Sequence, residues 1–221
     1  MKYQTVFDVV GPIMVGPSSS HTAGAIKIGK IAREIFGRKP KNAVVSFYGS
    51  FAKTYQGHGT DLAIIGGILD FDTDDSRILN SKKIAEKEGV NIQFIISDEK
   101  TVHPNTARIL LEDEIGKLEL VGISVGGGLV DITEINGFIV KVSGNSPIML
   151  VFHEDKFGLV ASVANVLGKN KINIGHMEVA RKEKGSVALM LIETDNPITD
   201  DVIKELNEIK SVNKVILLKT N

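Results

Sequence analysis

Residues 15–37 read VGPSSSHTAGAIKIGKIAREIFG and combine a polar cluster with an amphipathic helix pattern. Within 21–36, apolar side chains recur at helical spacing and charged side chains fall on another side. The apolar side consists of Ala25, Ile28, Ala32, Ile35 and Phe36. Gly37 supplies a left-handed stop after the last apolar residue. The stretch therefore predicts a helix that packs one face against a core.

The polar cluster that precedes this helix is larger than a helix start requires. One hydroxyl suffices to cap the first turn, and Ser19 or Ser20 would serve that purpose. The cluster also holds Ser18, His21 and Thr22, at a place where free backbone N–H groups favour an anion. The positive helix end disfavours imidazolium, so His21 is expected to be neutral, as a general base must be. A purely structural histidine is the alternative.

A second histidine lies in the same kind of setting. His58 stands between two glycines in GHGTD (57–61), just before an apolar helix pattern that starts at about Thr60. The glycines let the backbone approach a ligand closely. Two neutral histidines at two helix starts, if they converge on one anion, would suit proton abstraction next to a carboxylate. The sequence does not show that convergence.

Two further stretches carry weaker patterns. TVHPNTARI (101–109) places His103 and Asn105 on either side of a proline, and a turn leading into a strand explains it equally well. SVGGGLV (124–130) fits a β-turn and is not a phosphate-binding loop, because no Gly-Lys-Ser follows the glycines.

The front part of the chain alternates helices and strands before it becomes rich in strands. Helices are predicted at 21–36, from about Thr60 and at 81–89, and strands at 42–50, at 91–97 and in four segments between 106 and 143. Asn136-Gly137 indicates a hairpin turn, because both positions tolerate positive φ. Residues 1–143 are therefore predicted to form a mixed α/β domain.

A shorter and more regular pattern follows SGNSP (143–147), which is predicted to be a linker. Strand and helix segments then succeed one another in the order β-α-β-β-α-β. This order is that of ferredoxin-like domains, and we assign it to residues 147–221. The strand at 187–192 is apolar at every position, so both of its faces are expected to be covered.

The composition excludes several kinds of protein. Lys and Arg number 26 against 27 Asp and Glu, and with three Tyr and no Trp the chain lacks the features of nucleic-acid-binding proteins. The apolar run 62–69 is far short of a membrane span and the N-terminus lacks a signal-peptide core, so we expect a cytoplasmic location and no membrane partner. The absence of cysteine excludes disulfides, a cysteine nucleophile and ligation of an iron–sulfur cluster by this chain alone.

HEDKFGLVASVANVLGKNKINIGHMEVAR (153–181) resembles the ACT domain, a module that binds amino acids or other small effectors to regulate metabolic enzymes. The resemblance covers 147–219, with Phe157 where the family often has proline. A helix start offers free N–H groups to a carboxylate, which suits such a ligand. The effector-binding residues that the resemblance implies are Asp155, Gly158, Asn173 and Ile174. A domain that only dimerises through its sheet is the alternative.

GPSSSHTAG, GHGTD, HPNTA and SVGGG, in this order and followed by an ACT-like pattern, resemble the β subunit of bacterial iron–sulfur-dependent L-serine dehydratases. The resemblance covers essentially the whole chain. In single-chain relatives the front domain is fused to a cysteine-bearing catalytic domain, which this chain lacks. The front domain is also similar to an allosteric substrate-binding domain, which binds serine in some phosphoglycerate dehydrogenases.

The resemblance implies a share in the conversion of L-serine to pyruvate and ammonia. In that family a [4Fe–4S] cluster acts as a Lewis acid on the substrate, and its cysteines belong to the α subunit, the implied partner. This chain would bind L-serine in a site shared with the α subunit, hold no metal itself and self-associate through its ACT domain. The implied catalytic residues are His21 and His58. The implied substrate-binding residues are Ser18, Ser19, Ser20, Thr22, His103 and Asn105.

Two other functions stay open on the sequence. The first is a non-catalytic serine-sensing regulatory subunit of another amino-acid enzyme, which would need no proton shuttle, so His21 and His58 discriminate against it. The second is a self-contained hydrolase that uses Ser20 and His21. It is the least favoured, because adjacent residues on a helix point about 100° apart and are poorly placed to bond each other.

Overall fold

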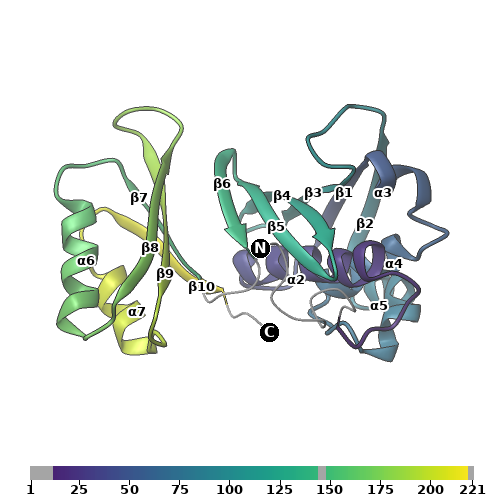
Figure 1. Ribbon diagram of the computed structural model, residues 1–221, viewed down its shortest axis with the longest axis horizontal. Coiled ribbons are helices and arrows are strands. Elements are labelled where there is room, and N and C mark those ends of the chain that lie inside the picture. Colours follow the sequence, from purple (N-terminus) through teal and green to yellow (C-terminus); the bar gives the residue numbers. More distant parts are fainter. Residues whose placement is uncertain (1–11, 144–147, 219–221) are drawn as a thin grey trace. The chain divides into compact units, whose positions relative to one another are not determined.

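The computed structural model describes residues 12–143 and 148–218. The chain divides into two compact units, of which the first ends at Asn136 and the second starts at Gly137. The strands form one sheet of six strands and one of four (Figure 1). No helix within the described ranges is long and apolar enough to cross a membrane. The predicted combination of a mixed α/β part and a βαββαβ part is confirmed.

The first helical segment begins earlier than predicted and has a different cap. Ser18 is the N-cap, in an extended conformation, and its hydroxyl accepts the N–H of His21 at 3.2 Å. The first turn, η1 (Ser19–Ala23), is π-helical and leads into α2 (Gly24–Phe36). The prediction that one of the next two serines caps the helix is therefore wrong, because the wider first turn moves the cap towards the N-terminus. Gly37 ends α2 at φ 80°, as predicted.

Helix α2 packs main chain to main chain against α4 (Thr60–Ile68). A Cβ on Gly29 would lie 2.5 Å from the Ile64 carbonyl oxygen. A Cβ on Gly67 would lie 2.1 Å from the Ile26 carbonyl oxygen. Neither position has room for a side chain, so the two glycines are what allow the helices to come this close.

The six-stranded sheet has the order β2-β1-β3-β4-β5-β6. Strands β1 and β2 pair in parallel, whereas β1–β3, β3–β4 and β4–β5 are antiparallel. Figure 1 shows α2, α4 and α5 gathered on one side of this sheet, and α2 packs on β3, β4 and β5. The strands are β1 (Asn42–Tyr48), β2 (Asn91–Ser97), β3 (Asn105–Glu112), β4 (Lys117–Gly126), β5 (Leu129–Ile135) and β6 (Phe138–Ser143), and the remaining helices are α3 (Gly49–Thr54), η2 (Ser76–Asn80) and α5 (Ser81–Lys87).

The ends of the predicted elements differ from the structure in few places. The strand predicted at 42–50 stops two residues early, because Gly49 takes φ 55° and starts α3. The hairpin at Asn136-Gly137 is confirmed, with φ of 48° and 77° at the two positions. Residues 144–147, most of the predicted linker, lie outside the described residues. The predicted domain limits at 143 and 147 stay predictions.

The four-stranded sheet has the order β10-β7-β9-β8, with all three described pairs antiparallel. Helices α6 and α7 cover one of its faces (Figure 1). The core between helices and sheet includes Met149, Val163, Met190 and Leu206, and residues 188–192 of β9 are all buried. The elements are β7 (Ile148–Glu154), α6 (Leu159–Lys169), β8 (Ile174–Arg181), β9 (Val187–Thr194), α7 (Asp200–Asn207) and β10 (Val212–Leu218).

Replacing Gly67 by Ala is expected to destabilise the first unit. The added methyl group would lie 2.1 Å from the Ile26 carbonyl oxygen, a main-chain atom that cannot move without displacing α2. Overpacking of this kind costs about 1–3 kcal/mol, which urea unfolding followed by circular dichroism would measure. Gly168→Ala on α6 is the matched control, because a Cβ there has no neighbour within 4 Å and Ala favours helices. Equal losses of stability in the two variants would contradict the close helix contact.

Candidate functional site

His21 lies in the first helical turn with a serine hydroxyl beside each ring nitrogen. Its Nε2 is 3.0 Å from Oγ of Ser50, and its Nδ1 is 3.4 Å from Oγ of Ser18. The Ser18 hydroxyl already accepts the His21 backbone N–H, so its own proton is available to Nδ1. The buried ring of Phe51 packs edge-on against the imidazole at 5.3 Å between centroids. Groups from two distant parts of the chain therefore fix the orientation of the imidazole.

The rings of His21 and His58 contact each other, with centroids 4.7 Å apart and planes at 68°. Burial lowers the pKa of His21, and the nearby His58 lowers it further, because two imidazolium charges repel. The structure thus brings together the two histidines that stand at separate helix starts. It also supports a neutral His21, although the main cause is desolvation and not the helix-end field inferred from the sequence.

The main chain around His58 is held from two sides. Its N–H donates to the carbonyl of Thr54 at 3.0 Å, and its own carbonyl accepts the hydroxyl of Thr22 at 3.2 Å. Gly59 takes φ 64°, a left-handed conformation that begins α4 and that glycine adopts without strain. The His58 Nδ1 is buried and has no hydrogen-bond partner among residues 12–143 and 148–218. Thr22, itself almost fully buried, therefore ties one helix start to the other.

Ser50 is positioned by the loop that carries His103 and Asn105. Its N–H donates to the Pro104 carbonyl at 2.7 Å, and Gly49 forms an antiparallel bridge with Asn105. A Cβ on Gly49 would lie 2.6 Å from that carbonyl oxygen, so glycine is what allows the loop to approach. The Asn105 N–H donates to Nδ1 of His103 at 3.2 Å, which places the proton of the neutral ring on Nε2. The HPN segment therefore borders the pair formed by His21 and Ser50.

The SVGGG stretch packs beneath the start of α2. Ser124 is fully buried, and its Oγ lies 2.2 Å from where a Cβ on Gly24 would be. Its carbonyl accepts the side-chain amide of Asn105 at 3.3 Å. Gly126, the last residue of β4, and Gly127 and Gly128, which form the turn to β5, all have positive φ, so the β-turn interpretation is confirmed. This stretch therefore packs against two parts of the site, the start of α2 and Asn105.

The predicted site residues differ in how they are placed. Ser19 and Ser20 are half-buried on the first turn, next to His21 in sequence. The ring of His21 pairs with Ser18 and Ser50, which leaves the hydrolase hypothesis, built on Ser20, without its hydrogen bond. Ser50 is the residue that the sequence analysis missed. A glycine and a serine after a strand gave a weak indication, but the partner ring lies far away in the sequence.

An iron–sulfur cluster does not fit the residues of this chain. In the part that the structure describes, no group of three or more His, Asp or Glu side chains is arranged to hold a metal ion. The full sequence contains no cysteine, and cysteine thiolates are the usual ligands of such clusters. The imidazoles and hydroxyls around His21 and His58 can instead bind an anionic group and exchange protons with it.

The effector-binding positions implied by the ACT resemblance lie in two places. These positions are Asp155, Gly158, Asn173 and Ile174. The first two follow β7, whose last residue pairs with Val187 at one end of β9. The last two stand at the start of β8, where Ile174 pairs with Thr194 at the other end of β9. Since a strand advances about 3.3 Å per residue, about 20 Å separate the two pairs within one chain.

The side chains at these positions have partners of their own. The Asp155 carboxylate accepts the Gly185 N–H at 2.9 Å and also contacts Arg181. The hydrogen bond from Gly185, with a smaller contribution from Arg181, holds the pKa of Asp155 below its ordinary value. The Asn173 side-chain amide donates to Asp195 at 2.5 Å. Both side chains therefore form hydrogen bonds that stabilise loops of their own domain.

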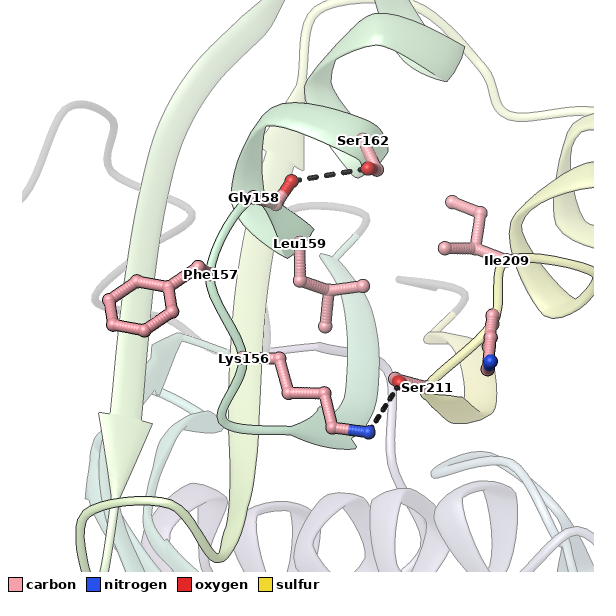
Figure 2. Close-up of a pocket in the computed structure, with 8 residues that line it drawn as sticks. Lys156, Phe157, Gly158, Leu159, Ser162, Ile209 and Ser211 are labelled. Carbon is pink, nitrogen blue, oxygen red and sulfur yellow. Dashed lines mark hydrogen bonds between the residues drawn. The ribbon is translucent and has the colours of Figure 1, made fainter.

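A pocket of about 450 Å³ lies between the start of α6 and the turn that precedes β10. Figure 2 draws the residues that line it. Gly158 is among its lining residues, and the Lys156 ammonium donates to the Ser211 hydroxyl at 3.3 Å. The Phe157 ring is fully exposed and extends from the side of the loop opposite Ile209 (Figure 2). The pocket is thus a concavity beside a helix start, and of the four implied effector positions Gly158 is the one that lines it.

Comparisons with known proteins match both parts of the chain. The family model "Serine dehydratase beta chain" matches residues 5–134, and the ACT domain model matches residues 148–211. The probable L-serine dehydratase β chain of Bacillus subtilis is 59% identical over 97% of this chain and 98% of that protein. The L-serine dehydratase β chain of Peptoniphilus asaccharolyticus is 36% identical over 90% of each chain. A D-3-phosphoglycerate dehydrogenase of Bacillus subtilis is 25% identical over 87% of this chain but 37% of that protein.

We predict that His21 titrates below 6.5, the ordinary value for histidine, and that His58→Gln raises its pKa by removing a neighbouring positive charge. NMR titration of the histidine-labelled chain would measure this, with the His21 resonance assigned by its loss in His21→Asn. His21 of the unfolded chain, with its ordinary pKa, takes up a proton at a higher pH than His21 of the folded chain. The contribution of His21 to the free energy of unfolding therefore falls as the pH drops below about 6.5. His176→Gln, at an exposed position of β8, is the control. A His21 pKa unmoved by His58→Gln would contradict the coupling.

Proposed function

The chain belongs to the serine dehydratase β-chain family and carries an ACT domain, and we propose that it is the β subunit of an L-serine dehydratase. The proposed reaction converts L-serine to pyruvate and ammonia. The observation that carries the proposal is the contact of His21 with His58, at 4.7 Å, beside the serine-rich helix start. A site that only bound serine would not need two imidazoles in contact.

Loss of water from L-serine requires removal of the α-proton next to a carboxylate. A neutral imidazole suits this step, and the lowered pKa of His21 keeps that ring unprotonated near neutral pH. Both nitrogens of His21 face serine hydroxyls, whereas Nδ1 of His58 is buried without a partner in the described residues, which leaves Nε2 of His58 for exchange with the substrate. We therefore assign His58 to proton exchange with the substrate. His21 is assigned to holding the His58 ring in place and to changing its charge state through the contact of the two rings.

The substrate carboxylate is assigned to the serines of the first turn. Ser19 and Ser20 stand where free backbone N–H groups and hydroxyls favour an anion, whereas the one hydroxyl proton of Ser18, the N-cap, is directed to His21 Nδ1. Asn105 forms a bridge with Gly49, and Pro104 accepts the Ser50 N–H, so this loop borders the site. His103, which accepts the Asn105 N–H, and Asn105 are assigned to orienting the substrate. The Thr22 hydroxyl, bonded to the His58 carbonyl, supports the site from inside.

The proposed function needs a second subunit. A [4Fe–4S] cluster held by cysteines of an α subunit would supply a Lewis acid for the departing hydroxyl. The present chain contains no cysteine and contributes imidazoles and hydroxyls to the shared site. The ACT domain is assigned to effector binding or to self-association of the assembled enzyme, as in a regulatory module.

Reconstitution tests this division of labour. The purified chain alone is expected to be colourless and to form no pyruvate from L-serine, because it lacks ligands for an iron–sulfur cluster. Anaerobic co-expression with a cysteine-containing α subunit is expected to give a brown complex that produces pyruvate and ammonia. A brown, active preparation of this chain alone would refute the two-subunit proposal.

Substitution of the two histidines tests their roles in the assembled enzyme. His58→Asn is expected to lower kcat by about 10²-fold or more, since a general acid–base group contributes at least that much. His21→Asn is expected to lower kcat by about tenfold or more, because His21 acts by placing the His58 ring. Circular dichroism and co-purification with the α subunit would verify folding and assembly. His176→Asn, an exposed histidine of the second unit, is the matched control. Turnover within a few-fold of wild type in both site variants would exclude the proposed catalytic roles.

A serine-sensing regulatory subunit is the second candidate. The similarity to a D-3-phosphoglycerate dehydrogenase over 87% of the chain favours it, because that protein belongs to a different class of enzyme. Calorimetry of the isolated chain with L-serine separates the two functions. Tight binding by the chain alone, without association with any iron–sulfur protein, would favour the sensor over the dehydratase subunit.

A further inference from the structure

We propose that Ser50 is a positioning residue that holds the His21 imidazole in one tautomer and one orientation next to His58. The inference rests on the proposed function only where it concerns turnover, because the placement of the ring is a property of this chain. The two residues come from different elements, η1 and α3, and meet through a hydrogen bond of 3.0 Å between Ser50 Oγ and His21 Nε2.

The hydrogen bonds on the two sides of the ring select the tautomer. Ser18 Oγ accepts the His21 backbone N–H at 3.2 Å, so its hydroxyl proton is directed towards Nδ1, 3.4 Å away. Nδ1 is then an acceptor, and the ring proton lies on Nε2, where it is donated to Ser50 Oγ. Without the Ser50 hydroxyl, Nε2–H loses this partner, and the preference for the tautomer rests on the longer Ser18 contact alone.

The main chain holds Ser50 firmly in this place. Its N–H donates to the Pro104 carbonyl at 2.7 Å, and its own carbonyl accepts the Thr54 hydroxyl at 2.9 Å. Gly49 at φ 55° lies directly against Pro104, and Phe51 is fully buried. A hydroxyl on so constrained a backbone acts as a fixed reference point, unlike one on a mobile surface loop.

The orientation matters because of what else contacts the ring. Phe51 and His58 meet the His21 imidazole edge-on, at 5.3 Å and 4.7 Å between centroids. His58 is the titratable side chain that contacts it among the described residues. A ring that turns away from Ser50 changes both the spacing and the charge coupling of the two histidines. Ser50 would thus act on the reaction through His21, without touching the substrate.

Ser50→Ala in the complex with the α subunit is the kinetic test. We expect kcat to fall about tenfold with KM changed less than about threefold, because ring placement is lost while substrate binding is kept. The acidic limb of the pH–rate profile is expected to move to lower pH, since the imidazolium loses its charge-assisted bond to the hydroxyl. Ser50→Thr, which retains the hydroxyl, should restore both quantities. Ser46→Ala, on the neighbouring strand β1, is the matched control.

NMR of the isolated, histidine-labelled chain gives a readout that does not depend on turnover. In Ser50→Ala the His21 nitrogen shifts are expected to move towards a mixture of the two tautomers, with Ser50→Thr close to wild type. Changed shifts in a chain that never forms an active complex would uphold the role of Ser50 and refute the dehydratase proposal. Unchanged shifts, or a wild-type pH profile in an active Ser50→Ala complex, would refute the role of Ser50.

Discussion

The contact between the main chains of α2 and α4 is the constraint on which the first unit depends. At Gly29 and Gly67 each helix meets backbone atoms of the other, at distances that exclude a side chain. His21 lies in η1, just before α2, and His58 lies two residues before α4. The hydrogen bond from the Thr22 hydroxyl to the His58 carbonyl joins these two helix starts, and the imidazoles contact each other at 4.7 Å. The close packing of the two helices and the site at their starts therefore belong to the same pair of helices.

The fold was largely predictable because the relevant patterns are local. Strand β2 has the predicted ends, and β1 starts at the predicted residue, Asn42. The cap at Ser18 was not predictable, because it depends on a π-helical first turn, and the residues of that turn contact residues distant in sequence. Gly24, at the end of that turn, lies against Ser124, which no local periodicity reveals. The strand order likewise depends on long-range pairing, such as the parallel pairing of β1 with β2.

The candidate site was predictable in its motifs and not in its connections. The motifs identified His21 and His58 because a histidine beside glycines or hydroxyls at a helix start is chemically conspicuous. Ser50 carries no such mark, since a single serine after a strand is common and its partner ring is distant in sequence. For the implied effector residues, the sequence pattern was found but the expected proximity was not. Asp155 and Ile174 match a family pattern, yet opposite ends of β9 separate them within one chain. A resemblance to a family shows which residues of this chain correspond to the family's functional positions. Whether those residues lie together depends on the folded molecule.

The link between Thr22 and residue 58 has a consequence for how this scaffold tolerates change. The Thr22 hydroxyl is bonded to the carbonyl of residue 58 and not to its ring, and the N–H of that residue is bonded to Thr54. Both anchors belong to the peptide backbone, and every amino acid except proline supplies them. The main-chain anchors thus do not depend on the side chain at residue 58, so another side chain that fits beside the His21 ring can be installed there without rebuilding the backbone around it.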